Sequence, residues 1–269
     1  MSKRVMGVLI VALAVALSPA WAEKMTFKDP MGDDDGPGTY TYPTDVVYTP
    51  GSFDIVEFVA DASGKNLDVE VTVAASLDDP WRMEVGFAVQ MIFIFIDTDG
   101  VAGSGYTDGL PGTNVKFAAG NEWDKAIILS PQSSSRVKQE VRTKAAAMAD
   151  DILVPNRVTG SGKTIKGSVK LSDIADSDPS TWGFQVIMQS NEGFPAKTDL
   201  LTRKVNEFEG QHRFGGGTDY DCDPHVMDIL AGNANGDKEE VELQHEMLSY
   251  ECDADGNAVK MATLKMVRR

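Results

Sequence analysis

The sequence is short of basic residues and of histidine, and each shortage argues against a class of function. Only 25 Lys and Arg stand against 41 Asp and Glu, which gives a formal net charge of −16. Phosphate backbones and anionic lipid surfaces repel such a chain, so nucleic acid and membrane surfaces are poor partners for it. The three histidines all lie in the C-terminal quarter, and no Gly-x-Ser-x-Gly motif accompanies them. We therefore predict that the chain is not an enzyme.

Long apolar segments are also missing. Residues 1–22 combine Lys3 and Arg4 with an apolar stretch over 5–17 and small residues up to Ala22. This pattern is typical of a secretory signal peptide cleaved after Ala22, and the stretch is shorter than the roughly 20 residues of a spanning helix. We expect a secreted or periplasmic protein with one domain over 23–269, whose net charge falls to −18 because the signal carries two cations and no acid.

Cysteine is nearly absent. The only two, Cys222 and Cys252, lie in the C-terminal part of a chain that we expect to be exported. Export favours a disulfide between them. A zinc site is the alternative, because His225 follows Cys222 at a ligand-like spacing and His245 lies between the two cysteines. No Cys-x-x-Cys pair supports that alternative.

What is present are short apolar segments separated by Gly, Pro, Asp and Asn, the pattern of an all-β fold. Residues 67–73 alternate apolar and polar, which predicts a strand with one buried face, whereas 91–96 are apolar throughout and predict a central strand covered on both sides. A Gly-Ser-Gly turn at 160–162 should lead into a strand from Ile165. The predicted strands cover residues 53–60, 67–75, 87–96, 126–129, 165–171 and 182–188.

Helical signals are few. Residues 137–151 could form a short surface helix or an exposed hairpin. Asp223 and Pro224 resemble an N-cap and a first-turn proline, which predicts a short helix over 225–230. We therefore expect a β-sandwich with short helices and a C-terminal extension held by the disulfide.

The densest acidic segment is the loop over residues 27–43. Asp33, Asp34 and Asp35 follow one another between glycines and prolines, and three adjacent carboxylates repel each other unless a cation neutralises them. Carboxylate oxygens on a constrained loop suit calcium, although the spacing is not that of an EF-hand. A solvated acidic turn is the alternative. Asp97 and Asp99 form a second, weaker candidate site at the end of the apolar segment.

Several motifs together resemble the C-terminal module of glucodextranases. They are Asp29-Pro-x-Gly-Asp-Asp-x-Gly-Pro-Gly-x-Tyr-x-Tyr-Pro43, Gly51-Ser-Phe-Asp-Ile55, Pro80-Trp81, Trp123-Asp124, the segment 213–219 and the segment 223–228. The broader group includes family-nine carbohydrate-binding modules and DOMON domains. The resemblance implies an immunoglobulin-like or jelly-roll β-sandwich that binds polysaccharide or a cell-surface glycan. It also implies a structural calcium ion with Asp29, Asp33, Asp34 and Asp54 as ligands.

Sugar rings pack their C–H faces on aromatic side chains, so exposed aromatics are the candidate binding residues. The candidates are Trp81, Trp123, Trp182, Tyr40 and Tyr42. For each of them a place in the core is the competing interpretation. Trp182 begins an apolar segment and Trp123 precedes one.

Two other functions remain open at this point. Related sandwiches serve as b-type haem subunits of exported molybdenum dehydrogenases, in which methionine and lysine ligate the haem. Met91, Met188 and Lys265 could take those places, although buried methionine more often fills a core. A structural role at the cell surface is the second alternative.

Overall fold

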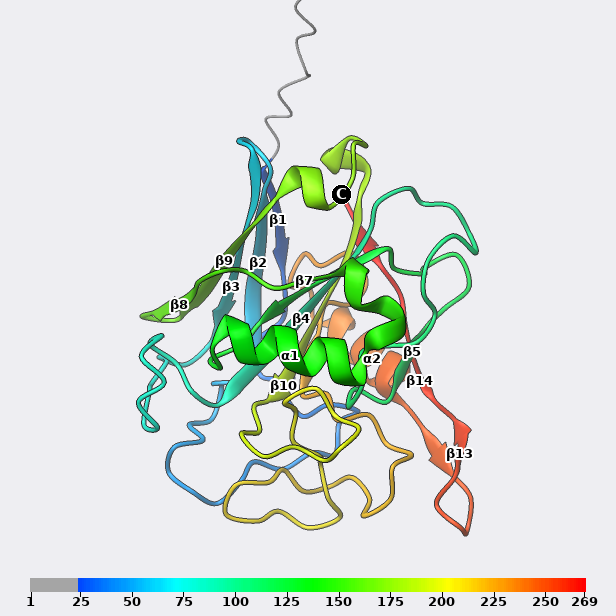
Figure 1. The fold of residues 1–269 in the computed structure, drawn as a ribbon. Coiled ribbons are helices and arrows are strands. Elements are labelled where there is room, and N and C mark those ends of the chain that lie inside the picture. The colour runs from blue at the N-terminus through cyan, green and yellow to red at the C-terminus, as the bar shows by residue number, and fades with distance from the viewer. Residues whose placement is uncertain (1–23) are drawn as a thin grey trace, which may run out of the picture.

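In the computed structural model, which describes residues 24–269, two β-sheets pack face to face (Figure 1). The predicted signal peptide lies outside the described residues. The first sheet has the order β1-β2-β3-β9-β8. Its strands are β1 (Lys24–Lys28), β2 (Ile55–Asp61), β3 (Asn66–Val73), β8 (Val158–Ser161) and β9 (Thr164–Lys170). The all-β sandwich and its predicted longer strands are confirmed.

The second sheet has the order β11-β10-β4-β6-β7, and β15 also pairs with β10. Its strands are β4 (Gln90–Asp97), β6 (Lys125–Leu129), β7 (Ile152–Leu153), β10 (Gly183–Ser190), β11 (Asp228–Ile229) and β15 (Val267–Arg268). Two small pairs complete the β structure: β5 (Val115–Phe117) with β14 (Ala262–Leu264), and β12 (Glu251–Cys252) with β13 (Ala258–Lys260). The helices are α1 (Ser134–Lys144), α2 (Glu239–Leu248) and the 3₁₀ turns Ala146–Asp151, Leu171–Asp173 and Pro179–Thr181.

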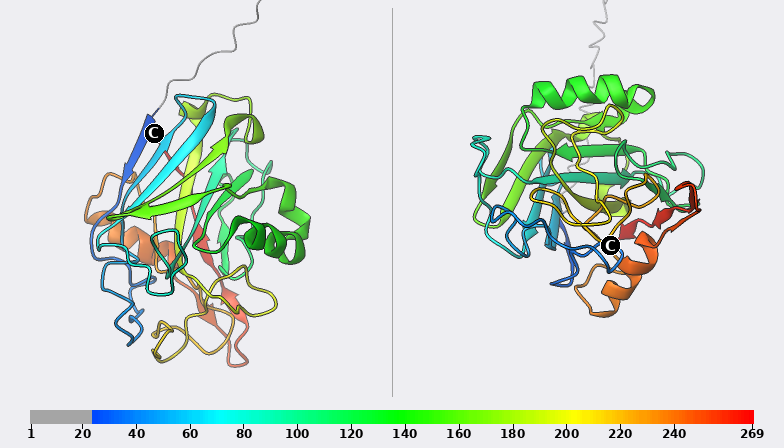
Figure 2. Two further views of the ribbon diagram at one scale, coloured as in Figure 1. Left: turned by 60° about the vertical axis from the view of Figure 1, so that its left-hand side comes forward. Right: turned by 90° about the horizontal axis from the view of Figure 1, so that it is seen from below.

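Two hydrophobic cores share the second sheet. The first lies between the sheets, where the ring of Phe184 on β10 is 5.5 Å from that of Phe58 on β2. The second lies on the other side of β4, where Phe93 and Phe95 pack with residues of α1 and with Trp123. Figure 2 shows α1 on the side of the second sheet that faces away from the first sheet. Every residue of β4 is therefore buried, as the apolar segment 91–96 predicts for the middle of the strand.

The prediction of a helix over residues 225–230 is wrong. This segment is extended, because Met227 N donates to the carbonyl oxygen of Met188 and β11 pairs with β10. Tertiary pairing at the sheet edge overrides the local start signal given by Asp223 and Pro224. Helix α2, which the sequence patterns did not predict, begins ten residues later with acidic residues in its first turn.

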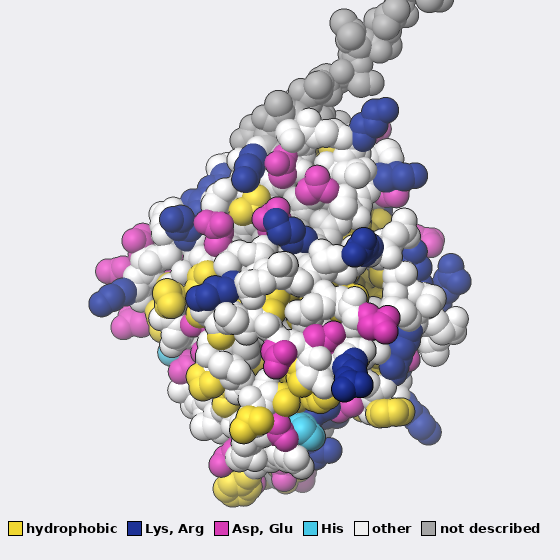
Figure 3. All heavy atoms as spheres, turned by 90° about the vertical axis from the view of Figure 1, so that its left-hand side faces the viewer, with side chains coloured by type: hydrophobic (Ala, Val, Ile, Leu, Met, Phe, Trp, Pro, Cys, Tyr) yellow, Lys and Arg dark blue, Asp and Glu magenta, His cyan; other side chains and the backbone are white. Residues whose placement is uncertain are grey.

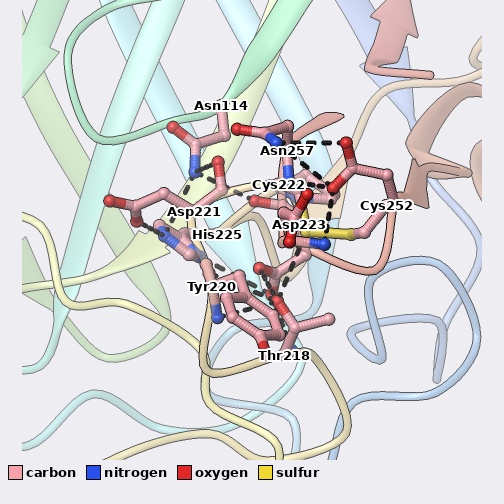
Figure 4. Close-up of a disulfide and its surroundings, with 12 residues drawn as sticks. Asn114, Thr218, Tyr220, Asp221, Cys222, Asp223, His225, Cys252 and Asn257 are labelled. Carbon is pink, nitrogen blue, oxygen red and sulfur yellow. Dashed lines mark hydrogen bonds and ion pairs between the residues drawn. A yellow bond between two sulfur atoms is a disulfide. The ribbon is translucent and has the colours of Figure 1, made fainter. Parts of the chain in front are cut away.

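The disulfide between Cys222 and Cys252 is confirmed, with a Cα–Cα distance of 5.8 Å. Figure 4 shows it beside Asp221, Asp223 and His225, where it joins the loop before β11 to β12. Closing a loop of this length stabilises the fold by about 3–4 kcal/mol in the chain-entropy estimate. Neither sulfur is left as a thiolate, so the zinc alternative loses its two cysteine ligands.

The two ends of the sandwich differ. The long connections 29–54 and 191–227 lie at the lower end in Figure 1, and we call this end of the sandwich the loop end. Thr41 and Gly215 form a β-bridge that joins the two connections. At the upper end the side chain of Arg269 donates to the carbonyl oxygen of Thr26 at 3.0 Å and lies 5.0 Å from the ring of Phe27. The end of the chain is thus fastened to β1. Among residues 24–269, no helix is both long enough and apolar enough to span a bilayer.

Candidate functional site

An acidic cluster forms where the two sheets meet. Asp29 directly follows β1 and Asp54 directly precedes β2, and these strand ends are adjacent because β1 and β2 are antiparallel neighbours. Asp228 opens β11 in the other sheet, and the backbone N–H of Ile55 donates to it at 2.5 Å. Asp33 lies on the turn after Asp29. The cluster therefore joins the N-terminal acidic loop to the C-terminal half of the chain.

Several oxygens of this cluster are buried without partners. Asp29 is 5% exposed, Asp33 1% and Asp228 0%, and one ligand atom from each lies within 4.8 Å of the others. Among the described residues, no hydrogen-bond donor reaches either carboxylate oxygen of Asp29, Oδ1 of Asp33 or Oδ1 of Asp54. A buried carboxylate without a partner is costly as an anion, so such a cluster needs protons or a cation.

Burial and mutual repulsion shift the acidity of the cluster. Burial, with the charge of Asp33, holds the pKa of Asp29 well above its usual range. Burial, with the charge of Asp29, does the same to the pKa of Asp228. Burial raises the pKa of Asp33 and of Asp54 to about 7, and the charges of Asp54 and of Asp34, respectively, add to these shifts. Four carboxyl groups are thus poised to release protons when a cation binds.

The donor set fits calcium. Calcium takes carboxylate and carbonyl oxygens at roughly 2.3–2.6 Å, so oxygens on opposite sides of its shell are about 5 Å apart. Three carboxylates whose ligand atoms lie within 4.8 Å of one another match that span. Glu240 adds its charge near Asp29 but accepts hydrogen bonds from the backbone N–H groups of residues 233, 235, 236 and 237. Glu240 therefore adds negative charge near the site, but its oxygens are already engaged and are not expected to coordinate the ion.

The structure groups the predicted ligands differently from the sequence-based expectation. It brings Asp29 and Asp33 together and places Asp54 near Asp33, but the carboxylate of Asp34 accepts the hydroxyl of Tyr42. Asp228 was not among the predicted ligands. Its only signal in the sequence is its place at the end of the 223–228 motif, because the contact with Ile55 spans 173 positions.

Three predicted sugar-binding aromatics belong to the core. Trp123 and Trp182 are 0% exposed, and their indole N–H groups donate to Asp108 O and to Ser177 Oγ, each at 2.8 Å. Tyr40 is 6% exposed, and its hydroxyl donates to the carbonyl oxygen of Pro224. None of the three presents a ring face to solvent, so we correct the expectation that they form a surface platform.

Tyr42 and Trp81 are partly buried. The hydroxyl of Tyr42 accepts hydrogen bonds from the backbone N–H groups of Gly51 and Phe53, so this ring organises the acidic loop. Trp81 lies at the loop end, with its ring centroid 6.1 Å from that of His212 and 6.3 Å from that of Tyr48. Its half-buried ring leaves Trp81 as a candidate for a ligand contact.

Other apolar side chains at the loop end are more exposed than Trp81. Figure 3 shows hydrophobic side chains gathered toward the lower part of the face it presents, among charges of both signs that are scattered over the whole face. The most exposed at the loop end are Met31 at 73%, Val46 at 92%, Phe194 at 94% and Phe208 at 72%. Sequence reasoning missed Phe194 and Phe208 because they lie on irregular loops without strand or motif signals.

The residues suggested for haem ligation do not converge. Met91 and Met188 are fully buried on neighbouring strands, but Met91 packs in the second core and Met188 in the first. Lys265 is exposed near the C-terminus. The two methionines therefore face opposite sides of one sheet and fill the cores.

Comparison with known protein families gives a match over most of the chain. A family model described as the C-terminal binding module, SLH-like, of glucodextranase matches residues 25–266. That range includes the acidic loop, both cysteines and both sheets except β15 and the first residue of β1. A search among curated proteins finds no match to the chain.

Proposed function

The chain belongs to the family of C-terminal binding modules of glucodextranase, and from this premise we propose that it is an exported, non-catalytic module that binds a polysaccharide or a cell-surface glycan. The family is one of binding modules rather than catalytic domains. The match over 25–266 is the observation that carries the proposal. Export fits the disulfide, which oxidising compartments favour.

A structural calcium ion is the second part of the proposal. Asp29, Asp33 and Asp228 would hold it, and Asp54 would complete the charge around it. The support is the set of buried carboxylate oxygens without donors. A cation there would tie the loop after β1 to β11 in the other sheet, and so fix the base of the loop end. Calcium would act on binding through the shape of these loops and not through contact with the sugar.

The loop end is the surface that we propose for the glycan. It carries the exposed ring of Phe194, and Trp81 borders it with Tyr48 and His212. Aromatic faces with nearby polar groups are the general means of holding a pyranose ring. A shallow surface of this kind gives affinities of about micromolar to millimolar, because it desolvates few contacts fully.

Retention on insoluble α- and β-glucans, followed by an assay for new reducing ends, tests this function. We expect the calcium-loaded protein to be retained and no reducing ends to appear. An inert resin is the control for non-specific retention. New reducing ends would contradict a non-catalytic role, and loss of the protein from every glucan would contradict glycan binding.

Chelation separates the two parts of the proposal. If calcium only shapes the loop end, retention should weaken in chelator and return when calcium is restored. Trp81→Ala should weaken retention without changing the effect of calcium on thermal stability. Retention that is indifferent to both changes would mean that another surface binds the glycan.

A further inference from the structure

The loop end contains a small cavity beside the most exposed aromatic ring of the described residues. Its volume is about 190 Å³, which is less than the roughly 300–1,000 Å³ of pockets that enclose a drug-sized ligand. We call it the Phe194 cavity. The lining residues that matter for its chemistry are Glu192, Phe194, Asp199, Arg203, Asn206 and Arg213. A cavity of this size beside a flat ring suits a single sugar unit of a longer polymer.

The ring of Phe194 is presented on a turn that the protein holds in place. Its backbone N–H donates to Glu192 Oε1 at 2.8 Å, and the guanidinium of Arg136 on α1 donates to the carbonyl oxygen of Gly193. Pro195 follows and restricts the backbone further. The ring is nevertheless 94% exposed. Leaving a whole phenyl ring in water forgoes about 1.5–3 kcal/mol of burial. Single exposed rings are common on protein surfaces, so it is the fixed position of this ring beside a cavity that favours a ligand contact.

Some of the polar residues that line the cavity bond to one another and to neighbouring loops, and so hold its wall in place. Glu192 Oε2 lies 2.9 Å from Arg203 Nε. The same guanidinium donates to the hydroxyl of Tyr48 at 3.3 Å and to the carbonyl oxygen of His212. These bonds fix the back of the cavity. They also connect it to the ring of Trp81, which packs on Tyr48 and His212.

The remaining polar groups are available for a ligand. Arg213 is exposed and makes no ion pair with the described residues. Asn206 donates its amide to Asp219 at 3.0 Å, which leaves its carbonyl oxygen as an acceptor. Asp199 accepts from the hydroxyl of Thr198 through Oδ1, and Oδ2 makes no hydrogen bond with the described residues. Donor and acceptor groups thus lie around the ring, as sugar hydroxyls require.

Charge decides the class of sugar. The cations of the lining are Arg203, Lys204 and Arg213. Glu192 and Asp199 oppose them within the lining, and Lys204 pairs with Asp221 outside it at 2.5 Å. The local charge is therefore balanced, while the whole chain carries a net charge of −16. Neither the cavity nor the whole chain favours an anionic sugar.

We infer that the Phe194 cavity is a subsite for one neutral pyranose ring. The sugar stacks on Phe194, and its hydroxyls bond to Arg213, Asn206 and Asp199. This inference rests on the proposed function and adds to it the place and the charge class of the ligand. It also replaces the buried tryptophans as the stacking residue, and Trp81 lies beside the same surface as a second contact for a longer chain.

The test compares two exposed phenylalanines. Phe194→Ala and Phe208→Ala each remove one ring from the loop end, but Phe208 does not line the cavity. Affinity electrophoresis of the calcium-loaded protein through gels containing soluble neutral α-glucan, neutral β-glucan or polygalacturonate gives the readout. We expect Phe194→Ala to weaken binding to the neutral glucan about tenfold, which corresponds to about 1.4 kcal/mol. Phe208→Ala should stay within about twofold of the starting protein.

Arg213→Gln probes the polar side of the cavity. It should weaken neutral binding by about threefold to fivefold, because a donor to the sugar is lost. Thermal melting of all three variants should match that of the starting protein, since each side chain is exposed.

Each outcome of the comparison has a distinct meaning. If the starting protein binds a neutral glucan and Phe194→Ala binds equally well, the cavity is not the subsite although the proposed function stands. If polygalacturonate binds more tightly than neutral glucan, the assigned sugar class is wrong. If the starting protein binds none of the three polymers, both the subsite and the proposed function are rejected.

Discussion

Among residues 24–269, two groups of three aspartates bring their oxygens within 4.8 Å of one another, yet only one of these groups has buried oxygens without partners. In the group of Asp29, Asp33 and Asp228, three such oxygens are found: both from Asp29 and one from Asp33. In the group of Asp97, Asp99 and Asp124, the protein supplies the donors and none of the carboxylate oxygens is buried without a partner.

The second group shows how a protein satisfies clustered acids by itself. Asp97 Oδ1 accepts the N–H of Gly100 at 2.7 Å, and Oδ2 faces the guanidinium of Arg268. Asp124 accepts the backbone N–H of Thr98 at 2.7 Å and its hydroxyl at 2.8 Å. Proximity of carboxylates is therefore not enough to indicate a metal. The first group differs in that three of its buried carboxylate oxygens receive no hydrogen bond from the described residues, and none of its carboxylates pairs with a Lys or Arg among them.

Removal of calcium should have the largest effect. A ligand that binds only the folded state, at about a hundredfold excess over its Kd, stabilises that state by about 2.7 kcal/mol. For a domain of this size we expect chelation to lower the Tm by roughly 5–10 °C. Differential scanning fluorimetry with chelator, and again after calcium is restored, measures the shift. An unchanged Tm would mean that the first group, like the second, does not bind calcium.

Asp29→Asn should abolish most of the change in Tm that calcium causes, which would assign that change to the first group. Neither oxygen of Asp29 accepts a hydrogen bond from the described residues, so the substitution removes charge without breaking such a bond. In chelator the variant should melt about 2–4 °C higher than the starting protein, because it removes a carboxyl group whose ionisation is opposed by burial and by the charge of Asp33, a gain of about 1 kcal/mol. Calorimetry in both conditions checks this. A variant that is less stable in both conditions, with the calcium shift intact, would give Asp29 a purely structural role.

Asp34→Asn should have a smaller effect, of another kind. Asp34 was a predicted ligand, but it accepts the hydroxyl of Tyr42. Weakening this bond should cost about 1 kcal/mol and lower the Tm by about 2–4 °C, equally with and without calcium. Melting curves in the two conditions distinguish the roles. Loss of the calcium shift would return Asp34 to the coordination shell.

Asp99→Asn should have the smallest effect. Asp99 is exposed, and its carboxylate accepts the backbone N–H of Val101 at 2.8 Å and the hydroxyl of Ser104 at 3.0 Å. We expect a stability change within about 0.5 kcal/mol and a full calcium shift. The same melting curves serve as the measurement. A reduced calcium shift would show that the second group also binds the ion.

Local patterns predicted the strands because strand formation leaves a periodic trace in the sequence. In β3, Leu67, Val69, Val71 and Val73 are fully buried and alternate with more exposed residues, as their spacing indicates. The hairpin before β9 was also predictable, although Gly160 and Ser161 belong to β8 and the turn itself is Gly162 and Lys163. Gly162 adopts a φ of +62°, which glycine tolerates well. The disulfide followed from there being only two cysteines.

The sequence predicted only those site residues that are close to one another along the chain. Asp29 and Asp33 belong to one loop, but Asp228 reaches the cluster through the pairing of β11 with β10 and a contact with Ile55 173 positions away. No pattern within a short window encodes that approach. The aromatics failed for a related reason, since a tryptophan beside a strand gives no sign of whether its ring faces the core or water.

The fastening of Arg269 to β1 at the upper end has a consequence for how copies of the module would act together. A neighbour or an anchor joined at either terminus would sit behind the sandwich, and the loop end would point away from it. Copies arrayed in this way would turn their Phe194 cavities toward the same polymer. Each proposed contact would be weak, but chains of repeating sugars would meet many copies at a high effective concentration. Avidity of the array, more than the affinity of one cavity, would then set how long the polymer stays bound.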